Sequence, residues 1–252
     1  MTEFKFKEFI DIMRRLRKEC PWDREQTNDS IKMATIEEAY ETLEAINNKN
    51  FNDLKEELGD LLLHVAFHSV IAEEEGHFTL EDVITGITEK LIRRHPHVFG
   101  EVQVENKGEV MKNWEAIKLA EGKKSVLSGV PVAMPALHRA ARMQEKAAKT
   151  GFEWQSPEDV KAKMLEERSE LEEAEASGDH DRLEEEFGDY LFALANYARF
   201  NKINPENALN LANQKFMNRF AYIEAELAKS HRTPADATLE EMLDLWVKAK
   251  EF

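Results

Sequence analysis

The stretch LKEELGDLLLHVAFHSVIA, residues 54–72, decides the fold. Wound at 3.6 residues per turn, it is apolar on nearly all sides, which predicts a buried helix. It nevertheless carries Glu57 and Asp60, which are three residues apart and therefore share one helix face. Buried carboxylates are costly unless they are paired or bind a metal. The stretch therefore predicts a helical bundle that contains a polar site.

A second copy of this pattern lies 129 residues further along the chain. The segment ELGDLLL at 57–63 corresponds to EFGDYLF at 186–192, and EEAYE at 37–41 corresponds to EERSE at 166–170. A repeat of this kind indicates two copies of one structural unit. We therefore predict an all-α fold of two tandem helical bundles. The predicted domains are residues 1–125 and 126–252, with a linker at about 122–135.

Few residues in the chain interrupt helices. Only 10 of the 252 residues are Gly and 7 are Pro, whereas average usage is about 7% and 5%. Thr79, Ser156 and Asn204 stand where helix N-caps are expected, and Pro follows the last two. The hydrophobic periodicity predicts helices at about 4–19, 29–47, 51–75, 79–94, 107–121, 134–149, 156–176, 180–200, 205–229 and 237–250.

The charge balance argues against two classes of partner. The chain holds 34 basic and 50 acidic residues, a net charge of −16. Residues 1–125 hold 18 basic and 26 acidic residues, and residues 126–252 hold 16 and 24, so each half has a net charge of −8. Neither half has the basic excess that nucleic acids attract. We therefore expect no nucleic-acid partner and no anionic membrane surface as a partner.

Cysteine usage and hydropathy indicate a cytoplasmic protein. Cys20 is the single cysteine, which excludes an intramolecular disulfide and a cysteine-based zinc site. The first residues, MTEFKFKEF, lack the apolar region of a signal peptide. The longest apolar runs, such as LLLHVAF at 61–67, are too short to span a bilayer.

Eight acidic residues recur with the same internal spacing of 3, 16 and 3 residues in both copies. A lone pair of this kind is ordinarily a solvated face, but repetition on a buried helix favours a site. Two antiparallel helices joined by a short loop can bring four carboxylates together. A set of ligands that consists of carboxylate oxygens and contains no cysteine favours Mg²⁺, with Mn²⁺ as a substitute. The predicted metal ligands are Glu38, Glu41, Glu57 and Asp60 in the first copy and Glu167, Glu170, Glu186 and Asp189 in the second.

Two basic pairs also recur. Lys90 and Arg94 in the first copy correspond to Lys215 and Arg219 in the second, each pair spaced i, i+4. Alone, such pairs are ordinary surface charges. Their repetition in an acidic protein, downstream of the candidate metal ligands, predicts that they bind phosphate oxygens.

Glycine and tryptophan recur as well. Gly59 and Gly188 stand directly before the acids of the second motif, although Gly inside a helix costs about 1 kcal/mol relative to Ala. Tight helix packing or the close approach of a ligand would explain this, and both interpretations stay open. We expect the repeated tryptophans to be core anchors; they are Trp22, Trp114, Trp154 and Trp246.

These residues resemble the MazG family of nucleoside triphosphate pyrophosphohydrolases, in the all-α NTP pyrophosphatase superfamily. The family motif, ExxE and then ExxD, is found as Glu38-Ala-Tyr-Glu41 with Glu57-Leu-Gly-Asp60, and again as Glu167-Arg-Ser-Glu170 with Glu186-Phe-Gly-Asp189. The resemblance covers nearly the whole chain and its tandem layout. It includes the segments CPWDREQT at 20–27, RRHPHVF at 93–99 and ANQKFMNRF at 212–220.

The resemblance implies Mg²⁺-dependent hydrolysis of nucleoside triphosphates to nucleoside monophosphate and pyrophosphate, in house-cleaning or nucleotide-pool control. It also implies a homodimer in which helices of two subunits complete the bundle. The implied catalytic residues are Glu167, Glu170, Lys215 and Arg219. The implied substrate-binding residues are Lys163, Asn213, Lys215 and Arg219, with Lys90 and Arg94 in the first copy.

The two copies differ in their polar residues. Asn213 corresponds to Thr88, and Lys163 corresponds to Ala34, so the second copy keeps more of the polar set. We therefore expect the second copy to carry the main activity. The first copy would be a weaker site, a site of different specificity or a regulatory site.

Two other interpretations stay open from the residues alone. A non-catalytic acidic scaffold would show neither Mg²⁺-dependent stabilisation nor nucleotide turnover. An iron or manganese carboxylate oxidase would need Glu-x-x-His motifs on two helices. His64 and His68 correspond to Ala193 and Tyr197, so we interpret the histidines as packing or surface residues. Base preference, from canonical to damaged nucleotides, is not readable from the sequence.

Overall fold

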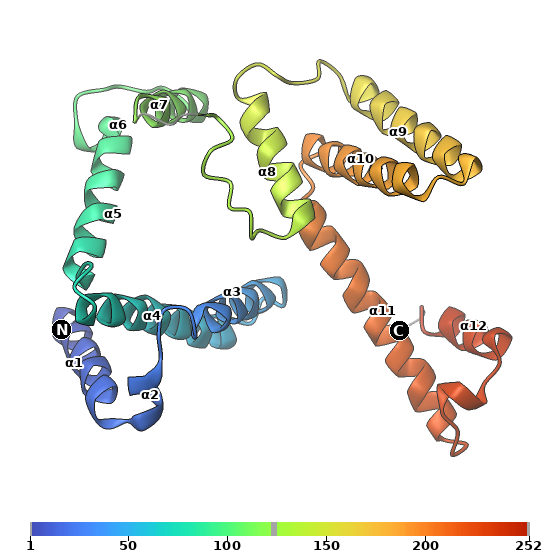
Figure 1. Cartoon of the computed structure of the whole chain (residues 1–252), viewed down its shortest axis with the longest axis horizontal. Helices are drawn as coiled ribbons and strands as arrows, with labels where there is room; N and C mark the ends of the chain where they lie inside the picture. Colours follow the sequence, from blue (N-terminus) through green and yellow to red (C-terminus); the bar gives the residue numbers. More distant parts are fainter. Residues whose placement is uncertain (1, 122–124, 251–252) are drawn as a thin grey trace. The chain divides into compact units, whose positions relative to one another are not determined.

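The computed structural model describes residues 2–121 and 125–250, and all regular structure in these ranges is helical (Figure 1). The prediction of an all-α fold is confirmed. The first helices are α1 (Thr2–Glu19), α2 (Pro21–Glu25), α3 (Lys32–Asn47), α4 (Phe51–Glu74), α5 (Leu80–Arg94), α6 (Pro96–Phe99) and α7 (Lys107–Ala120). They are followed by α8 (Ala136–Ala148), α9 (Pro157–Ser177), α10 (His180–Phe200), α11 (Pro205–Ala228), the 3-10 helix η1 (Pro234–Asp236) and α12 (Leu239–Lys248).

The chain divides into two units, residues 1–121 and 122–252. The predicted domain boundary, between residues 125 and 126, lies a few residues after the point at which these two units divide. It stays a prediction. Of the expected linker, residues 125–135 form turns and contain no helix, and residues 122–124 lie outside the described residues.

Each unit is built on a helical hairpin whose short loop the sequence explains. The side chain of Asn50 accepts hydrogen bonds from the amides of Asn52 and Asp53 and so starts α4 directly after α3. In the second unit, Gly178 ends α9 in the left-handed conformation (φ 73°), and Asp179 caps α10. Figure 1 shows α3 beside α4 and α9 beside α10, in agreement with their extensive contacts.

The core of the first unit lies where α1 meets the second half of α4. Met13 and Ile71 are almost fully buried there, beside Phe67 and Val70. The first half of α4 is different, because Leu62 and other large apolar side chains on it are exposed. The expectation that this helix is buried on nearly all sides is therefore wrong within the described chain. Too few helices of the unit pack against α4 to cover it.

The expected N-caps are confirmed. Thr79 and Ser156 each form a capping box, with Asp82 and Asp159 respectively, and Asn204 accepts a hydrogen bond from the amide of Asn207. The short elements α2, α6 and η1 are not among the helices predicted from the sequence. Each begins with a proline and has too few residues to show a helical period.

Candidate active site

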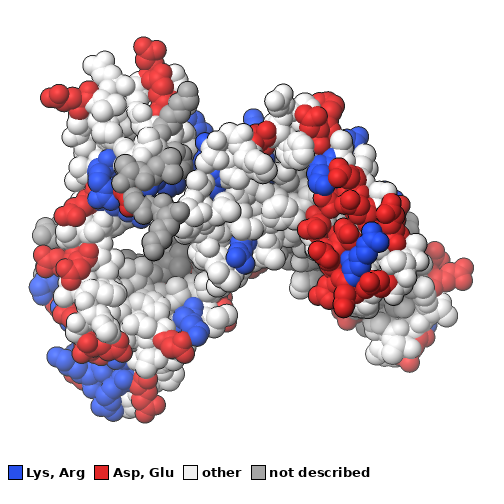
Figure 2. Space-filling view, turned by 45° about the horizontal axis from the view of Figure 1, so that its top comes forward, with Lys and Arg blue, Asp and Glu red and all other residues white. Residues whose placement is uncertain are grey.

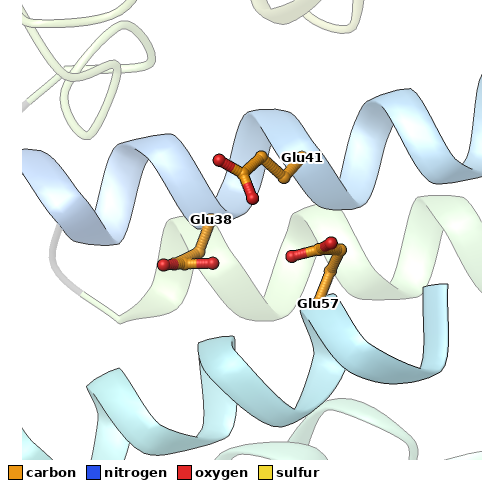
Figure 3. Close-up of side chains that lie close together, drawn as sticks. All are labelled: Glu38, Glu41 and Glu57. Carbon is orange, nitrogen blue, oxygen red and sulfur yellow. The ribbon is translucent and has the colours of Figure 1, made fainter. Parts of the chain in front are cut away.

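Three of the four predicted carboxylates converge in the first unit. Glu38 and Glu41 project from α3 and Glu57 from α4, and one oxygen of each lies within 4.8 Å of the others. Figure 3 shows the three side chains between the two helices. Asp60 is not part of this group, but it is close enough to help raise the pKa of Glu38 and Glu57.

The second unit repeats the arrangement with a different fourth member. Glu167 projects from α9, Glu186 and Asp189 project from α10, and their ligand atoms also lie within 4.8 Å of one another. Here Glu170 is outside the group. The pKa of Glu170 is raised, chiefly by desolvation and then by the charges of Glu167 and Glu186. Repetition of the motifs therefore places four carboxylates near one point in each unit, and three of them have one oxygen each within 4.8 Å of the others.

The electrostatics of the first group favour a cation. Desolvation is the largest cause of the raised pKa of Glu38 and Glu57, and the neighbouring carboxylates add to it. Neither group contains a histidine or a cysteine. A set of carboxylate oxygens suits a hard divalent ion such as Mg²⁺, because such ions prefer oxygen ligands. The residues present therefore fit the expected metal.

Lys163 lies against the second group. Its Nζ is 2.7 Å from an oxygen of Glu167 and 2.7 Å from an oxygen of Glu166. Hydrogen bonds to these two carboxylates raise the pKa of Lys163, so its ammonium group stays charged at neutral pH. The substrate-binding residue expected from the sequence thus stands beside the candidate metal ligands.

A cavity of about 580 Å³ opens beside the second group. Glu167, Asp189 and Lys163 line it together with mostly apolar side chains from α8, α10 and the loop before α9. This cavity was not predicted from the sequence, although the recurrence of Trp154, which lines it, was one signal of it. The other lining residues are Leu127, Met143, Gln144, Ala147, Gly151, Phe152, Glu153, Trp154, Phe192, Ala193, Asn196 and Arg199.

The first unit carries a buried polar network at the corresponding place. His64 stands where the second unit has Ala193, and it is 8% exposed. Its Nδ1 is 3.0 Å from the hydroxyl oxygen of Thr35, which is also 2.8 Å from Nε2 of His68. Nδ1 of His68 lies 2.6 Å from Oδ1 of Asn28. His64 also lies beside the carboxylate group, because its Nε2 is 3.9 Å from an oxygen of Glu38, so the interpretation of the histidines as packing or surface residues stays a prediction.

The polar residues expected on α11 are not joined to the carboxylate group of the second unit within the described residues. Lys215, Arg219 and Asn213 lie on α11, and no hydrogen bond or ion pair links them to the carboxylate group within the described residues. Arg219 instead lies over the indole ring of Trp246, 5.3 Å from its centroid. Their expected contact with phosphate stays a prediction.

In the first unit, one of the expected phosphate ligands has a carboxylate partner. Arg94 is ion-paired with Glu121, and so is Arg93, whose NH2 is 2.9 Å from the same carboxylate. Hydrogen bonds from both arginines lower the pKa of Glu121 to about 2. Lys90 lies one helical turn before Arg94 on α5 and is exposed.

Two expectations about the repeated residues change. Trp22 is 63% exposed and Trp154 is 39% exposed, so these two are not core anchors, whereas Trp114 and Trp246 are half-buried. A Cβ atom at Gly188 would meet nothing within 4 Å, and the same holds at Gly59. Tight packing within the described chain is therefore not the reason for these glycines.

Acidic side chains are crowded on one face of the second unit. Figure 2 shows Asp and Glu side chains crowded on its right, in the region of α9 and α10, with few Lys or Arg among them.

None of the helices in the described ranges is long and apolar enough to cross a membrane.

Comparison with known proteins agrees with this geometry. The family model of the MazG nucleotide pyrophosphohydrolase domain matches twice, at residues 26–99 and 155–222. The chain is 47% identical to the "Nucleoside triphosphate pyrophosphohydrolase/pyrophosphatase MazG" of Thermotoga maritima, covering 97% of this chain and 95% of that protein. It is 42% identical to the "Nucleoside triphosphate pyrophosphohydrolase" of Escherichia coli strain K12, covering 96% and 95%.

A third relative has the same region inside a longer chain. The "Uncharacterized protein YabN" of Bacillus subtilis is 49% identical over 98% of this chain, which spans 52% of that protein. Both family matches include an ExxE pair and an ExxD pair, and each lies within one of the two units. With the motifs, the helical hairpins and the family match in agreement, the chain belongs to the MazG nucleotide pyrophosphohydrolase family.

Proposed function

We propose that this chain hydrolyses nucleoside triphosphates between the α and β phosphorus atoms, giving nucleoside monophosphate and pyrophosphate. One observation carries the proposal: the carboxylate group of Glu167, Glu186 and Asp189 stands at the edge of the apolar cavity. A polyphosphate needs cationic neutralisation, and a nucleoside needs an apolar pocket. The second unit offers both side by side. The printed names of the relatives describe the same reaction for those proteins.

Mg²⁺ is the proposed cofactor, with Mn²⁺ as a substitute. Glu167, Glu186 and Asp189 would hold it, and Glu38, Glu41 and Glu57 would hold it in the first unit. When bound, the ion neutralises the triphosphate and makes its phosphorus more electrophilic. Glu170 and Asp60, the remaining carboxylate of each motif pair, lie close enough to contribute through their charge or a water molecule.

The protein's own residues have distinct tasks in the proposed reaction. Glu170 orients the attacking water and accepts its proton as the water oxygen bonds to the α phosphorus. The bond from this phosphorus to the bridging oxygen then breaks, and pyrophosphate leaves. Lys215 and Arg219 stabilise the charge that develops on the leaving group, since both are cations without a carboxylate partner among the described residues. Lys163 holds Glu167 in place and binds a phosphate oxygen.

The proposal includes a homodimer in the cytoplasm whose action is house-cleaning or control of nucleotide pools. Large apolar side chains on both hairpins are exposed, which supports burial against a second subunit. They include Leu58, Leu62 and Val65 on α4 and Leu165, Phe187 and Leu191 on α9 and α10. The second unit is the main site in this proposal, and the first unit is a weaker or regulatory site.

The test is a Mg²⁺-dependent assay of the full chain across NTPs, dNTPs and oxidised or deaminated analogues, with pyrophosphate and phosphate measured separately. We expect pyrophosphate and nucleoside monophosphate in equal amounts and no turnover in EDTA. Phosphate with nucleoside diphosphate would show that the assigned bond is wrong. Absence of any turnover, together with no stabilisation by Mg²⁺, would favour the non-catalytic scaffold.

A further inference from the structure

His64 of the first unit directs one ring nitrogen at a candidate metal ligand. Its side chain is buried, and its Nε2 lies 3.9 Å from Oε1 of Glu38, which is too far for a hydrogen bond. No hydrogen bond ends on this nitrogen within the described residues. The buried unpartnered atoms of the same residues belong to His97, Arg139 and Gln144, so Nε2 of His64 keeps access to solvent. A small ion can therefore reach it.

A chain of hydrogen bonds fixes the ring from its other side. Nδ1 of His68 lies 2.6 Å from Oδ1 of Asn28, which can only accept, so His68 donates there. Burial lowers the pKa of His68, and the neutral ring therefore accepts at Nε2 from the hydroxyl group of Thr35, at 2.8 Å. Thr35 in turn accepts from Nδ1 of His64, at 3.0 Å. The lone pair of His64 is left on Nε2, as in a metal-binding imidazole whose other nitrogen is held by a hydrogen bond.

Two carboxylates adjoin this nitrogen. Asp60 lies four residues before His64 on α4 and shares its helix face, and its charge helps to raise the pKa of Glu38. His64 lies outside the group of three carboxylates, but Glu38 has two oxygens and can face both the group and the histidine. Metal bonds to nitrogen and oxygen of about 2.0–2.2 Å allow two ligands of one ion to lie about 4 Å apart. The separation of 3.9 Å between His64 and Glu38 therefore fits a shared ion.

The sequence of the second unit does not repeat this network. At the offset of 129 residues, the positions of Thr35, His64 and His68 hold Met164, Ala193 and Tyr197. The second unit nevertheless brings three of its carboxylates together. The hairpin thus forms its acidic group without a histidine, and the two sites differ in the type of ligand they offer.

We propose that His64 is a nitrogen ligand of the metal site in the first unit, where it shares an ion with Glu38 and Asp60. Imidazole nitrogen suits transition ions such as Zn²⁺ and Co²⁺, whereas Mg²⁺ prefers oxygen. The first unit therefore favours such ions over Mg²⁺ more strongly than the second unit, whose group contains only carboxylates. This inference rests on the metal site of the proposed function but not on nucleotide hydrolysis, because the ion binds without substrate.

Paramagnetic ¹H NMR of the full chain loaded with Co²⁺ tests the ligand directly. The proton on Nδ1 of a Co²⁺-bound imidazole is shifted far downfield and is lost in D₂O, whereas carboxylate ligands give no such signal. We expect this signal in the wild type and its absence in His64→Ala, which gives the first unit the residue found at Ala193. His77→Ala replaces an exposed histidine of the first unit and should keep the signal.

Calorimetry without nucleotide measures the preference between ions. In a chain that carries Glu186→Gln and Asp189→Asn, which weaken the second site, His64→Ala should raise the Kd for Co²⁺ at least about tenfold. The Kd for Mg²⁺ should change much less, because Mg²⁺ relies on the carboxylates. His64→Gln, which leaves a smaller void, tests the same difference if His64→Ala does not fold.

Two results would overturn the inference. One is a wild type that binds Co²⁺ without the shifted, exchangeable signal. The other is an equal loss of affinity for Co²⁺ and Mg²⁺ in the His64 variants, since a purely structural role would weaken both ions alike. Failure of the proposed metal site gives a different result, because the wild type would then bind neither ion in the first unit, and the inference would fall with it.

Discussion

The guanidinium group of Arg94 is ion-paired with the carboxylate of Glu121 in the first unit. In the second unit the corresponding Arg219 lies over the ring of Trp246, and no carboxylate pairs with it among the described residues. The two units therefore differ at the residue expected to bind phosphate.

Replacing this carboxylate should strengthen phosphate binding by the first unit. Glu121→Gln removes the charge that competes with phosphate for Arg93 and Arg94. In a chain that also carries Lys215→Ala, which weakens the second site, calorimetry with pyrophosphate and Mg²⁺ should show a several-fold lower Kd. Glu101→Gln makes the same change in net charge at an exposed position and should leave the Kd unchanged. An unchanged Kd in Glu121→Gln would contradict the competition.

The same ion pair predicts a pH dependence. The pKa of Glu121 is lowered from 4.5 to about 2 by its hydrogen bonds to Arg94 and Arg93. A lowered pKa means that the pair stabilises the fold at pH values above about 4.5, and that this contribution is lost as the pH falls towards 2. A carboxyl ¹³C NMR titration should therefore find Glu121 still ionised at pH 4. Titration near 4.5 would mean that the pair does not form in solution.

Single substitutions should separate the two sites. Glu170→Gln removes the proposed proton acceptor of the second unit and should lower pyrophosphate release at least about 100-fold, the usual contribution of a general base. Glu41→Gln is the matched change in the first unit and should keep most of the activity. Equal losses in the two variants, or a loss confined to Glu41→Gln, would refute the assignment of the main activity to the second unit.

Mg²⁺ should stabilise the fold, because both carboxylate groups concentrate negative charge. At a concentration one hundred times its Kd, an ion that binds one folded site adds about 2.7 kcal/mol to the free energy of unfolding. Differential scanning fluorimetry should show a higher Tm with MgCl₂ than with NaCl of equal ionic strength. Glu186→Gln with Asp189→Asn should remove part of the shift, and adding Glu57→Gln should remove more. A shift that all these variants keep would place the ion elsewhere.

Alanine at the second glycine should separate stability from activity. A Cβ atom at Gly188 meets nothing within 4 Å, so Gly188→Ala should stabilise the helix by about 1 kcal/mol in denaturant unfolding. Activity should nevertheless fall if a ligand or second subunit approaches this backbone. Gly59→Ala is the matched change in the first unit and should bring a similar gain in stability. Full activity in Gly188→Ala would remove close approach as the reason for the residue.

The local part of the fold could be predicted from the sequence because its causes are local. Ser156 starts α9 through a capping box with Asp159, three residues later. The i, i+3 spacing within each motif fixes the helix face on which its acids lie. Once Asn50 and Asp179 make the hairpin loops short, convergence of the two motifs follows.

The rest could not be predicted because it depends on contacts between distant residues. Arg94 and Glu121 are 27 residues apart, and no periodicity in the sequence connects the two positions. The cavity needs Gln144 from α8, Trp154 from a loop and Asn196 from α10. Trp22 and Trp154 were expected in the core because they are large and repeated, but repetition is equally consistent with a residue that lines a site.

The hydrogen bonds that Lys146 donates to the segment before α8 determine where the chain could be divided. Its ammonium group donates to the carbonyl oxygens of Val126 and Ser128, and Leu127 between them forms part of the cavity wall. This stretch of the expected linker therefore belongs to the second unit. A gene that lost its first half in evolution would keep the complete wall of this cavity only if the new protein began ahead of Val126.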